Sequence, residues 1–319
     1  MVEVHVIDLA CDDREIATVL DTVCRDIGFF QIVGHGVDEE ISADAWRAFQ
    51  EFFDLPDEEK MRLRPPSPGY PYGYIPVKAE SLANSLGGKA PGDLKESFNV
   101  GPVDRPAHQI TDPDELRLYS ANLWPESLPA LQPAAAAYYR EMLRLAVRLM
   151  RLFSLALDLD PYFFDDKIDR APCALRAINY PQTSEPLEQG QLRAGAHTDY
   201  GPLTILRQDE VGGLQVLGHD DDWVSVPSID GALVINIGDL MARWTNDRWR
   251  STLHRVVHPL GDTGAAARRQ SMPFFFNANF DAEVACLPSC LDHDGTAKYS
   301  AVRAGPHLLH KFERSLSIT

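Results

Sequence analysis

The sequence predicts a mainly β protein with flanking helices, and two observations support this prediction. Between residues 174 and 280, short apolar runs alternate with turn-forming clusters about every ten residues, a pattern typical of a β-sandwich or barrel. Residues 129–157 instead carry apolar side chains at helical spacing, which indicates a long helix packed against the outside of the sheet. No repeat or linker divides the 319 residues, so we expect a single domain over 1–319.

The amino-terminal region, residues 4–110, combines short strands with helices. Alternating apolar residues predict strands, and apolar residues at a spacing of three or four predict helices. By these patterns a strand, a helix, a second strand and a second helix follow one another at residues 4–9, 12–27, 28–33 and 39–53. The segment 63–91 is rich in Pro, Gly and Tyr, which favours a loop. A long loop of this kind can form a wall of a substrate site or simply cover a barrel.

The carboxyl-terminal tail, residues 295–316, carries a further helical pattern. Its apolar side chains recur at Val302, Leu308, Leu309 and Phe312. We therefore expect a closing helix over the whole of this segment.

A metal-binding pattern lies at the start of the predicted strands. His197 and Asp199 are alternate residues at the entrance to the apolar run 202–206, and alternate residues of an extended segment point to the same side. Two imidazoles and one carboxylate leave one face of a metal open, as a non-haem iron(II) centre needs to hold a co-substrate and O2. His219 and Asp221 match the same tripeptide, but they lie in a polar Gly/Asp cluster that predicts a hairpin turn.

His254 is the candidate third ligand. It lies in a β-branched, apolar run, and strand-sized runs at residues 213–217, 223–226 and 232–237 separate it from Asp199. An antiparallel sheet that folds back on itself can therefore bring the strand of His254 beside that of His197. Spacing alone leaves open that the three are unrelated polar side chains.

Several motifs follow one another in the chain, among them GAHTDYG at 195–201, NIGDL at 236–240, STLHRV at 251–256 and RQSMPFFF at 269–276. Together with segments at 6–9, 28–37 and 95–98, they resemble the isopenicillin N synthase-like iron(II)/2-oxoglutarate-dependent oxygenases. The resemblance spans residues 4–282, nearly the whole chain. It implies a double-stranded β-helix (jelly roll) core over 174–282, wrapped by amino-terminal helices and closed by a carboxyl-terminal lid helix over 295–316.

The resemblance also implies a chemistry. His197, Asp199 and His254 would bind Fe(II) in a dioxygenase that consumes O2 and the co-substrate 2-oxoglutarate. The co-substrate is decarboxylated to succinate while a small-molecule substrate is oxidised, by default through hydroxylation. The carboxylate of Asp199 argues against halogenation, because halogenases of the family leave that position vacant for chloride.

Arg269 and Ser271 are the candidates for holding the co-substrate. 2-Oxoglutarate chelates iron through its 2-oxo group and C1 carboxylate, which leaves its C5 carboxylate to be anchored elsewhere. A planar guanidinium can grip a carboxylate at two points, and a hydroxyl two residues on in a strand faces the same way. The alternative is a surface arginine beside the small-residue run 265–267. The resemblance assigns Arg269 and Ser271 to the anchor and adds Tyr180 as a further hydrogen-bond donor.

Four further residues are candidates for contacting the substrate: Arg176, Phe275, Asn277 and Tyr72. Arg176 resembles in position an arginine of the bacterial ethylene-forming enzyme. Phe275 and Asn277 follow Ser271 with the alternation of a strand. Tyr72 lies in the aromatic part of the loop 63–91.

Two alternatives keep the metal and change the reaction. Isopenicillin N synthase itself uses Arg-Gln-Ser to hold a carboxylate of its peptide substrate, and this chain has Arg269-Gln270-Ser271. An oxidase that uses no 2-oxoglutarate therefore stays open. Ethylene formation is the second alternative, because the motif at 195–201 also resembles the ethylene-forming enzyme.

Composition limits the possible partners. The chain has 47 acidic and 30 basic residues, a net charge of −17, which repels phosphate backbones and anionic membranes and so excludes nucleic acid and membrane partners. Its five cysteines form no CxxC pair and suit a reducing compartment, and its start has no signal-peptide pattern. We expect a cytoplasmic monomer whose partner is a small-molecule substrate.

Overall fold

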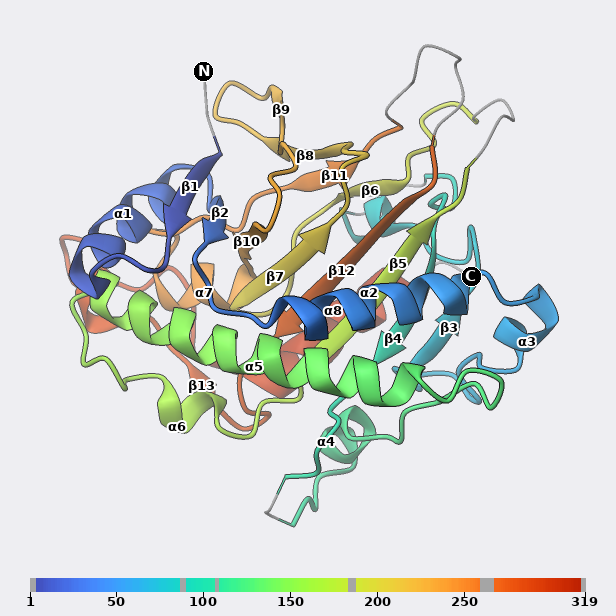
Figure 1. Cartoon of the computed structure of the whole chain (residues 1–319). Coiled ribbons are helices and arrows are strands. Elements are labelled where there is room, and N and C mark those ends of the chain that lie inside the picture. Colours follow the sequence, from blue (N-terminus) through green and yellow to red (C-terminus); the bar gives the residue numbers. More distant parts are fainter. Residues whose placement is uncertain (1–3, 87–89, 107–108, 183–187, 259–266, 317–319) are drawn as a thin grey trace.

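Two β-sheets form the centre of the computed structural model, which describes residues 4–86, 90–106, 109–182, 188–258 and 267–316 (Figure 1). The described part of the major sheet has eight strands in the order β1-β2-β10-β7-β12-β5-β4-β3, and the minor sheet has four in the order β6-β11-β8-β9. A third, two-stranded sheet joins β13 to β14. Within the major sheet, β1 and β2 are parallel, and the other neighbours are antiparallel.

The described elements have the following bounds. The strands are β1 (His5–Asp8), β2 (Phe29–Val33), β3 (Gly73–Ile75), β4 (Glu96–Val100), β5 (Ala174–Tyr180), β6 (Ala194–His197), β7 (Leu203–Gln208), β8 (Leu214–Leu217), β9 (Trp223–Ser225), β10 (Leu233–Ile237), β11 (His254–Val256), β12 (Arg269–Phe276), β13 (Glu283–Val284) and β14 (Val302–Arg303). The helices are α1 (Asp13–Asp26), α2 (Glu39–Phe53), α3 (Asp57–Met61), α4 (Pro113–Leu118), α5 (Leu131–Ala156), α6 (Asp165–Ile168), α7 (Asp239–Trp244) and α8 (Ala304–Leu316), with 3₁₀ turns η1 (Leu82–Leu86) and η2 (Pro288–Cys290).

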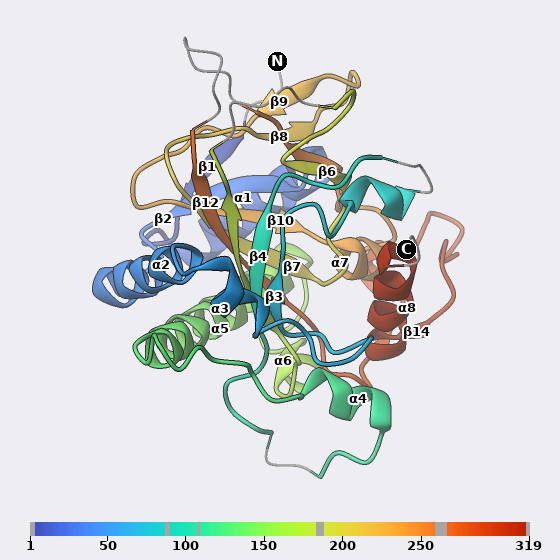
Figure 2. The same ribbon diagram turned by 90° about the vertical axis from the view of Figure 1, so that its right-hand side faces the viewer.

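The two faces of the major sheet have different surroundings, as the side chains of β12 illustrate. Met272, Phe274 and Phe276 are buried in the main hydrophobic core, and the ring of Phe274 lies 5.0 Å from that of Tyr139 on α5. Because side chains alternate along a strand, Arg269, Ser271 and Phe275 lie on the opposite face of β12. Figure 2 shows α2 and α5 on one side of the major sheet and the minor-sheet strands β8 and β9 on the other. The polar residues of β12 therefore face the interior between the sheets.

Two helices of the outer face, α1 and α2, begin where the sequence provides a cap. Asp12 accepts a hydrogen bond from the backbone N–H of Arg14 at the start of α1, and Asp38 accepts from those of Glu40 and Ile41 at the start of α2. Both helices pack on α5, whose buried stripe covers the sheet. This layer is a rigid support for the strands that carry the site.

The predicted fold class is confirmed: a core of two β-sheets flanked by helices. The strands predicted at 4–9 and 28–33 and the helices predicted at 12–27, 39–53 and 129–157 are also confirmed to within two residues at each end. The residues 4–110 do more than wrap the core, because β1 to β4 all belong to the major sheet.

Two sequence predictions were wrong in detail. The segment 63–91 contains β3 and η1 in addition to loop, because β3 pairs with β4 over residues that no local pattern connects. The helix predicted over 295–316 begins only at Ala304. Gly295 has a positive φ of 78°, and Val302 pairs with Val284 in the β13–β14 sheet. The helical spacing of Val302 with later residues was therefore coincidental.

Gly28, which precedes β2, is packed closely against the backbone of Arg250, and substitution can test this contact. Its φ is +62°, and a Cβ placed there would lie 2.0 Å from the carbonyl oxygen of Arg250, whereas Gly36, with φ +67°, has free space around it. We expect Gly36→Ala to lower the free energy of unfolding by about 1–2 kcal/mol, the cost of the left-handed conformation alone. Gly28→Ala should cost at least about 3 kcal/mol, because overlap with backbone is added. Urea denaturation would measure both, and equal losses would contradict the packing argument.

Candidate metal and co-substrate site

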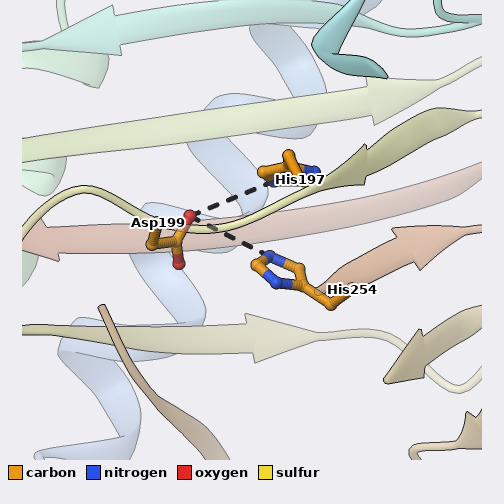
Figure 3. A group of neighbouring side chains, drawn as sticks. All are labelled: His197, Asp199 and His254. Atoms are coloured by element: carbon orange, nitrogen blue, oxygen red, sulfur yellow. Dashed lines mark ion pairs between the residues drawn. The ribbon is translucent and has the colours of Figure 1, made fainter. Parts of the chain in front are cut away.

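The pairing of β6 with β11 brings the three predicted metal ligands together. His197 ends β6, His254 begins β11, and the two are direct cross-strand partners. Asp199 lies two residues beyond His197, in the connection to β7. Figure 3 shows both imidazoles beside this carboxylate, with the Nε2 atoms of His197 and His254 at 4.0 and 3.9 Å from Asp199 Oδ1. One ligand atom from each residue lies within 4.8 Å of the others.

The carboxylate of Asp199 is oriented by two residues of the major sheet. Thr204 on β7 and Asn236 on β10 are cross-strand partners, and both donate to Asp199 Oδ2, at 2.6 and 2.7 Å. This leaves Oδ1 as the oxygen that faces the histidines. Residues in the second layer of a metal site commonly fix their ligands in this way.

Backbone carbonyl groups orient the two histidines. Nδ1 of His197 lies 2.7 Å from the carbonyl oxygen of Gly195, and Nδ1 of His254 lies 3.2 Å from that of Thr252. A proton on each Nδ1 leaves the Nε2 lone pairs free. Burial, followed by the nearby His254, lowers the pKa of His197 to about 3. Burial would raise the pKa of Asp199, but the two nearby histidines and the hydrogen bonds from Thr204 and Asn236 together outweigh it, and the pKa is lowered. This donor set fits a divalent metal such as Fe(II), with an open face.

Asp239, the first residue of α7, fastens the segments that carry the ligands. Its backbone N–H donates to the carbonyl oxygen of Asp199 at 2.8 Å. Its carboxylate accepts from Ser251 at 2.6 Å and from Thr198 at 3.3 Å. Lys311 of α8 donates to the same carboxylate at 2.8 Å. The carboxyl-terminal helix is therefore connected to both segments that supply metal ligands.

Arg269, Ser271 and Tyr180 lie together on the inner face of the major sheet. Arg269 is the cross-strand partner of Tyr180, its Cζ atom lies 4.9 Å from the centre of that ring, and all three residues are at most 2% exposed. Arg269 Nη2 donates to Gln208 Oε1 at 3.1 Å, while Nε and Nη1 have no hydrogen-bond partner among the described residues. A buried guanidinium with unpaired N–H groups is costly unless an anion binds it. The arginine is therefore not the surface residue of the alternative interpretation.

Arg176 belongs to a buried network of charges on the same inner face. Its Nε donates to Ser97 Oγ at 3.1 Å and its Nη2 to Glu80 Oε2 at 2.5 Å. Lys95 lies 3.7 Å from Glu80 and 2.8 Å from Asp93. Burial would raise the pKa of Glu80, but Arg176 and Lys95 lower it to about 2, so the carboxylate stays ionised. Glu80 and Arg176 are the more accessible members, with side chains 18% and 14% exposed.

The other predicted substrate residues occupy different surroundings. Phe275 is partly exposed on the inner face of β12. The hydroxyl of Tyr72 donates to the carbonyl oxygen of Leu118, and Nδ2 of Asn277 donates to the carbonyl oxygen of Pro172 at 2.8 Å. Both groups thus have partners within the protein, and a role for them in substrate binding stays a prediction.

His219 lies in the turn between β8 and β9, as predicted, and its ring contacts Asp26 and Arg250 rather than the metal site.

Sequence reasoning missed Thr204, Asn236 and Glu80. The signal for the first two was available, because Thr204 lies in the apolar run that opens β7 and Asn236 is the one polar residue of β10.

The geometry defines a jelly-roll protein with a two-histidine, one-carboxylate site, and comparison with known proteins agrees. The model of the 2OG-Fe(II) oxygenase superfamily matches residues 172–278, and that of the amino-terminal domain of non-haem dioxygenases in morphine synthesis matches residues 4–127. Validamycin A dioxygenase of Streptomyces hygroscopicus subsp. limoneus is 35% identical over 304 residues, covering 93% of this chain and 80% of the relative.

A plant relative and two solved structures are also similar. Homoarginine-6-hydroxylase of Oryza sativa subsp. japonica is 33% identical over 309 residues, covering 94% of this chain and 89% of the relative. A full-length Neurospora crassa protein, solved in complex with alpha-KG and thymine, has a TM-score of 0.84 and 27% identity, covering 99% of this chain and 97% of that one. JOX2 in complex with 2OG, Fe and JA has a TM-score of 0.76 and 27% identity, covering 96% and 88%.

The chain belongs to the 2OG-Fe(II) oxygenase superfamily, in its isopenicillin N synthase-like family. It is an Fe(II)- and 2-oxoglutarate-dependent dioxygenase that acts on small molecules. The alternative without 2-oxoglutarate is therefore set aside. Among the described residues, no helix is both long and apolar enough to cross a bilayer.

The hydrogen bonds to Asp199 Oδ2 give a prediction about metal affinity. Asn236→Ala and Thr204→Val each remove one donor, and we expect either change to weaken Fe(II) binding about 10–100-fold, the usual cost of losing a second-layer partner. Asp199→Ala should abolish binding. Anaerobic Fe(II) titration would measure these affinities, with His219→Ala as a control that leaves them unchanged. Wild-type affinity in both Asn236→Ala and Thr204→Val would contradict the assigned role.

Proposed function

We propose that the enzyme hydroxylates a small polar molecule bound between the metal ligands and the Glu80–Arg176 pair. The observation that carries the proposal is that Arg269 and Arg176, the partner of Glu80, lie on the inner face of the major sheet, which faces the minor sheet that carries His197 and His254. His197, Asp199 and His254 would hold Fe(II), which, when bound, supplies the oxidation of the substrate by O2. 2-Oxoglutarate would be converted to succinate and CO2, one oxygen atom of O2 entering succinate and the other the hydroxylated product.

The protein's own residues would orient the co-substrate. Arg269 has N–H groups on Nε and Nη1 without a hydrogen-bond partner among the described residues, which suits binding of the C5 carboxylate. Ser271 and Tyr180 lie on the adjacent strands β12 and β5, with Tyr180 opposite Arg269, and their hydroxyls could donate to the same carboxylate. Their near-complete burial would exclude water from this end of the site.

The substrate we propose is amino-acid-like, with both a cationic and an anionic group. Glu80 and Arg176 neutralise each other, and each keeps part of its side chain accessible, so a zwitterion could share both without leaving an unpaired charge. The similarity to homoarginine-6-hydroxylase, whose name specifies a basic amino acid, supports the same class. Phe275 would add an apolar wall, and Tyr72 and Asn277 are weaker candidates. α8 would cover the site as a lid, since Lys311 connects it to the metal-bearing segments.

The co-substrate role of Arg269 can be tested apart from catalysis. Anaerobic addition of 2-oxoglutarate to the Fe(II) protein should produce the weak visible charge-transfer band of a chelated 2-oxo acid. Arg269→Ala should weaken 2-oxoglutarate binding by roughly 3–5 kcal/mol, the order expected for a lost buried charge pair, and leave Fe(II) bound. Absence of the band in the wild type at millimolar 2-oxoglutarate would refute the co-substrate assignment.

The substrate class can be tested by succinate release in air. Arginine and homoarginine should stimulate release more than neutral thymine or an anionic carboxylic acid, and Glu80→Gln should raise KM for the stimulating amino acid at least ten-fold. The control is Glu188→Gln, whose carboxylate forms an exposed pair with Lys78 at 3.5 Å. Stimulation by neutral or anionic compounds alone would contradict the proposal. Ethylene in the headspace would instead support the ethylene-forming alternative.

A further inference from the structure

A second buried arginine lies at the co-substrate end of the barrel. Arg193 immediately precedes β6, four residues before the metal ligand His197, and its backbone N–H donates to the carbonyl oxygen of Val256 at 3.1 Å. The residue is 0% exposed. Its Nη2 donates to the carbonyl oxygen of Ala267, while Nε and Nη1 have no hydrogen-bond partner among the described residues. Burying such groups unpaired is costly, so their retention indicates a binding role.

Arg193 and Arg269 approach the same aromatic ring from different sheets. The Cζ atoms of Arg193 and Arg269 lie 5.9 and 4.9 Å from the centre of the Tyr180 ring. Arg193 immediately precedes β6, the minor-sheet strand that ends at His197, whereas Arg269 belongs to β12 of the major sheet. Each guanidinium has an unpaired Nε and an unpaired Nη1 among the described residues. Four N–H-bearing nitrogens thus remain unpaired around Tyr180.

The charges at this end of the barrel do not balance. Asp209 is the described carboxylate that acts on both arginines, and its Oδ1 lies 3.9 Å from Arg269 Nε. It already accepts hydrogen bonds from the backbone N–H groups of Gln270, at 2.6 Å, and Val211, at 3.1 Å. Burial and the positive charge of Arg269 lower the pKa of Arg193. Two buried cations beside one anion leave an excess positive charge that a bound carboxylate would neutralise.

We propose that Arg193 is a second guanidinium of the co-substrate site and holds the C5 carboxylate of 2-oxoglutarate together with Arg269. This inference rests on the proposed role of Arg269. A carboxylate held by both arginines would connect the metal-bearing strand of the minor sheet to β12 of the major sheet. Succinate keeps the same carboxylate, so the pair would also hold the product.

The test separates recognition of the C5 carboxylate from chelation of the metal. 2-Oxopentanoate has the same chain length as 2-oxoglutarate and the same chelating groups, but it lacks the distal carboxylate. Both acids are titrated anaerobically into the Fe(II) protein and followed by the charge-transfer band, and succinate is titrated by calorimetry. For Arg193→Met we expect the Kd of 2-oxoglutarate and of succinate to rise at least ten-fold, with that of 2-oxopentanoate changed less than three-fold.

Two further variants complete the design. Arg193→Lys keeps the charge and loses the two-point geometry, so we expect a smaller rise in the Kd of 2-oxoglutarate, and it replaces the methionine variant if that fails to fold. Arg207→Met is the matched control, because Arg207 is partly buried with its Cζ 4.5 Å from the centre of the Trp46 ring on α2, and it should leave all three affinities unchanged.

Each of the other outcomes would refute the role assigned to Arg193 or the role assigned to Arg269. Equal weakening of 2-oxoglutarate and 2-oxopentanoate in the Arg193 variants would indicate a purely structural role and overturn the inference, as would unchanged affinities. If Arg269→Met weakens 2-oxoglutarate while the Arg193 variants do not, only the second guanidinium is refuted. If Arg269→Met is itself silent, the proposed co-substrate site fails.

Discussion

The geometry of the metal site depends on hydrogen bonds that connect the major sheet to the ligands beside the minor sheet. Pairing of β6 with β11 sets His197 against His254, but both belong to the minor sheet, and the third ligand needs a fixed position from outside it. Thr204 and Asn236 of the major sheet provide this by holding Asp199 Oδ2. A buried carboxylate is costly without such donors, so the bonds that orient the ligand also make its burial tolerable. The distance between the sheets is thereby linked to the geometry of the metal ligands.

The interior of the barrel contains two kinds of charged group, which differ in whether they have partners within the protein. Around Glu80 and Arg176 every charge has an opposite partner, and such a network accepts a ligand that is itself balanced. Around Arg269 and Arg193 the N–H groups are unpaired among the described residues, and the nearby Asp209 is already engaged by backbone donors. A folded protein tolerates unpaired buried cations chiefly where a ligand completes them. We therefore expect the two ends of the interior to bind different ligands.

Local chemistry explains how much of this could be predicted from the sequence. The helices capped by Asp12 and Asp38 and the strand that ends at His197 carry their signals within a few residues. The strand β3 could not be predicted, because its partner β4 supplies what its own Pro, Gly and Tyr content does not. The roles of Glu80 and Arg193 were hidden for the same reason: each depends on groups brought together only by the sheet topology.

The carboxyl-terminal helix α8 is held by two kinds of contact, one ion pair and a group of apolar side chains. The ion pair of Lys311 with Asp239 is partly exposed, with side chains 32% and 16% accessible, and a pair of this kind contributes at most about 1 kcal/mol. Leu308 and Leu309 are buried with Phe280 and would stabilise the docking by more, about 1.5–3 kcal/mol for each leucine. The apolar contacts therefore hold α8 in place, while the ion pair sets which residue of the helix lies against Asp239. Because Asp239 also binds Thr198 and Ser251, the register of the helix and the position of the metal ligands are determined together.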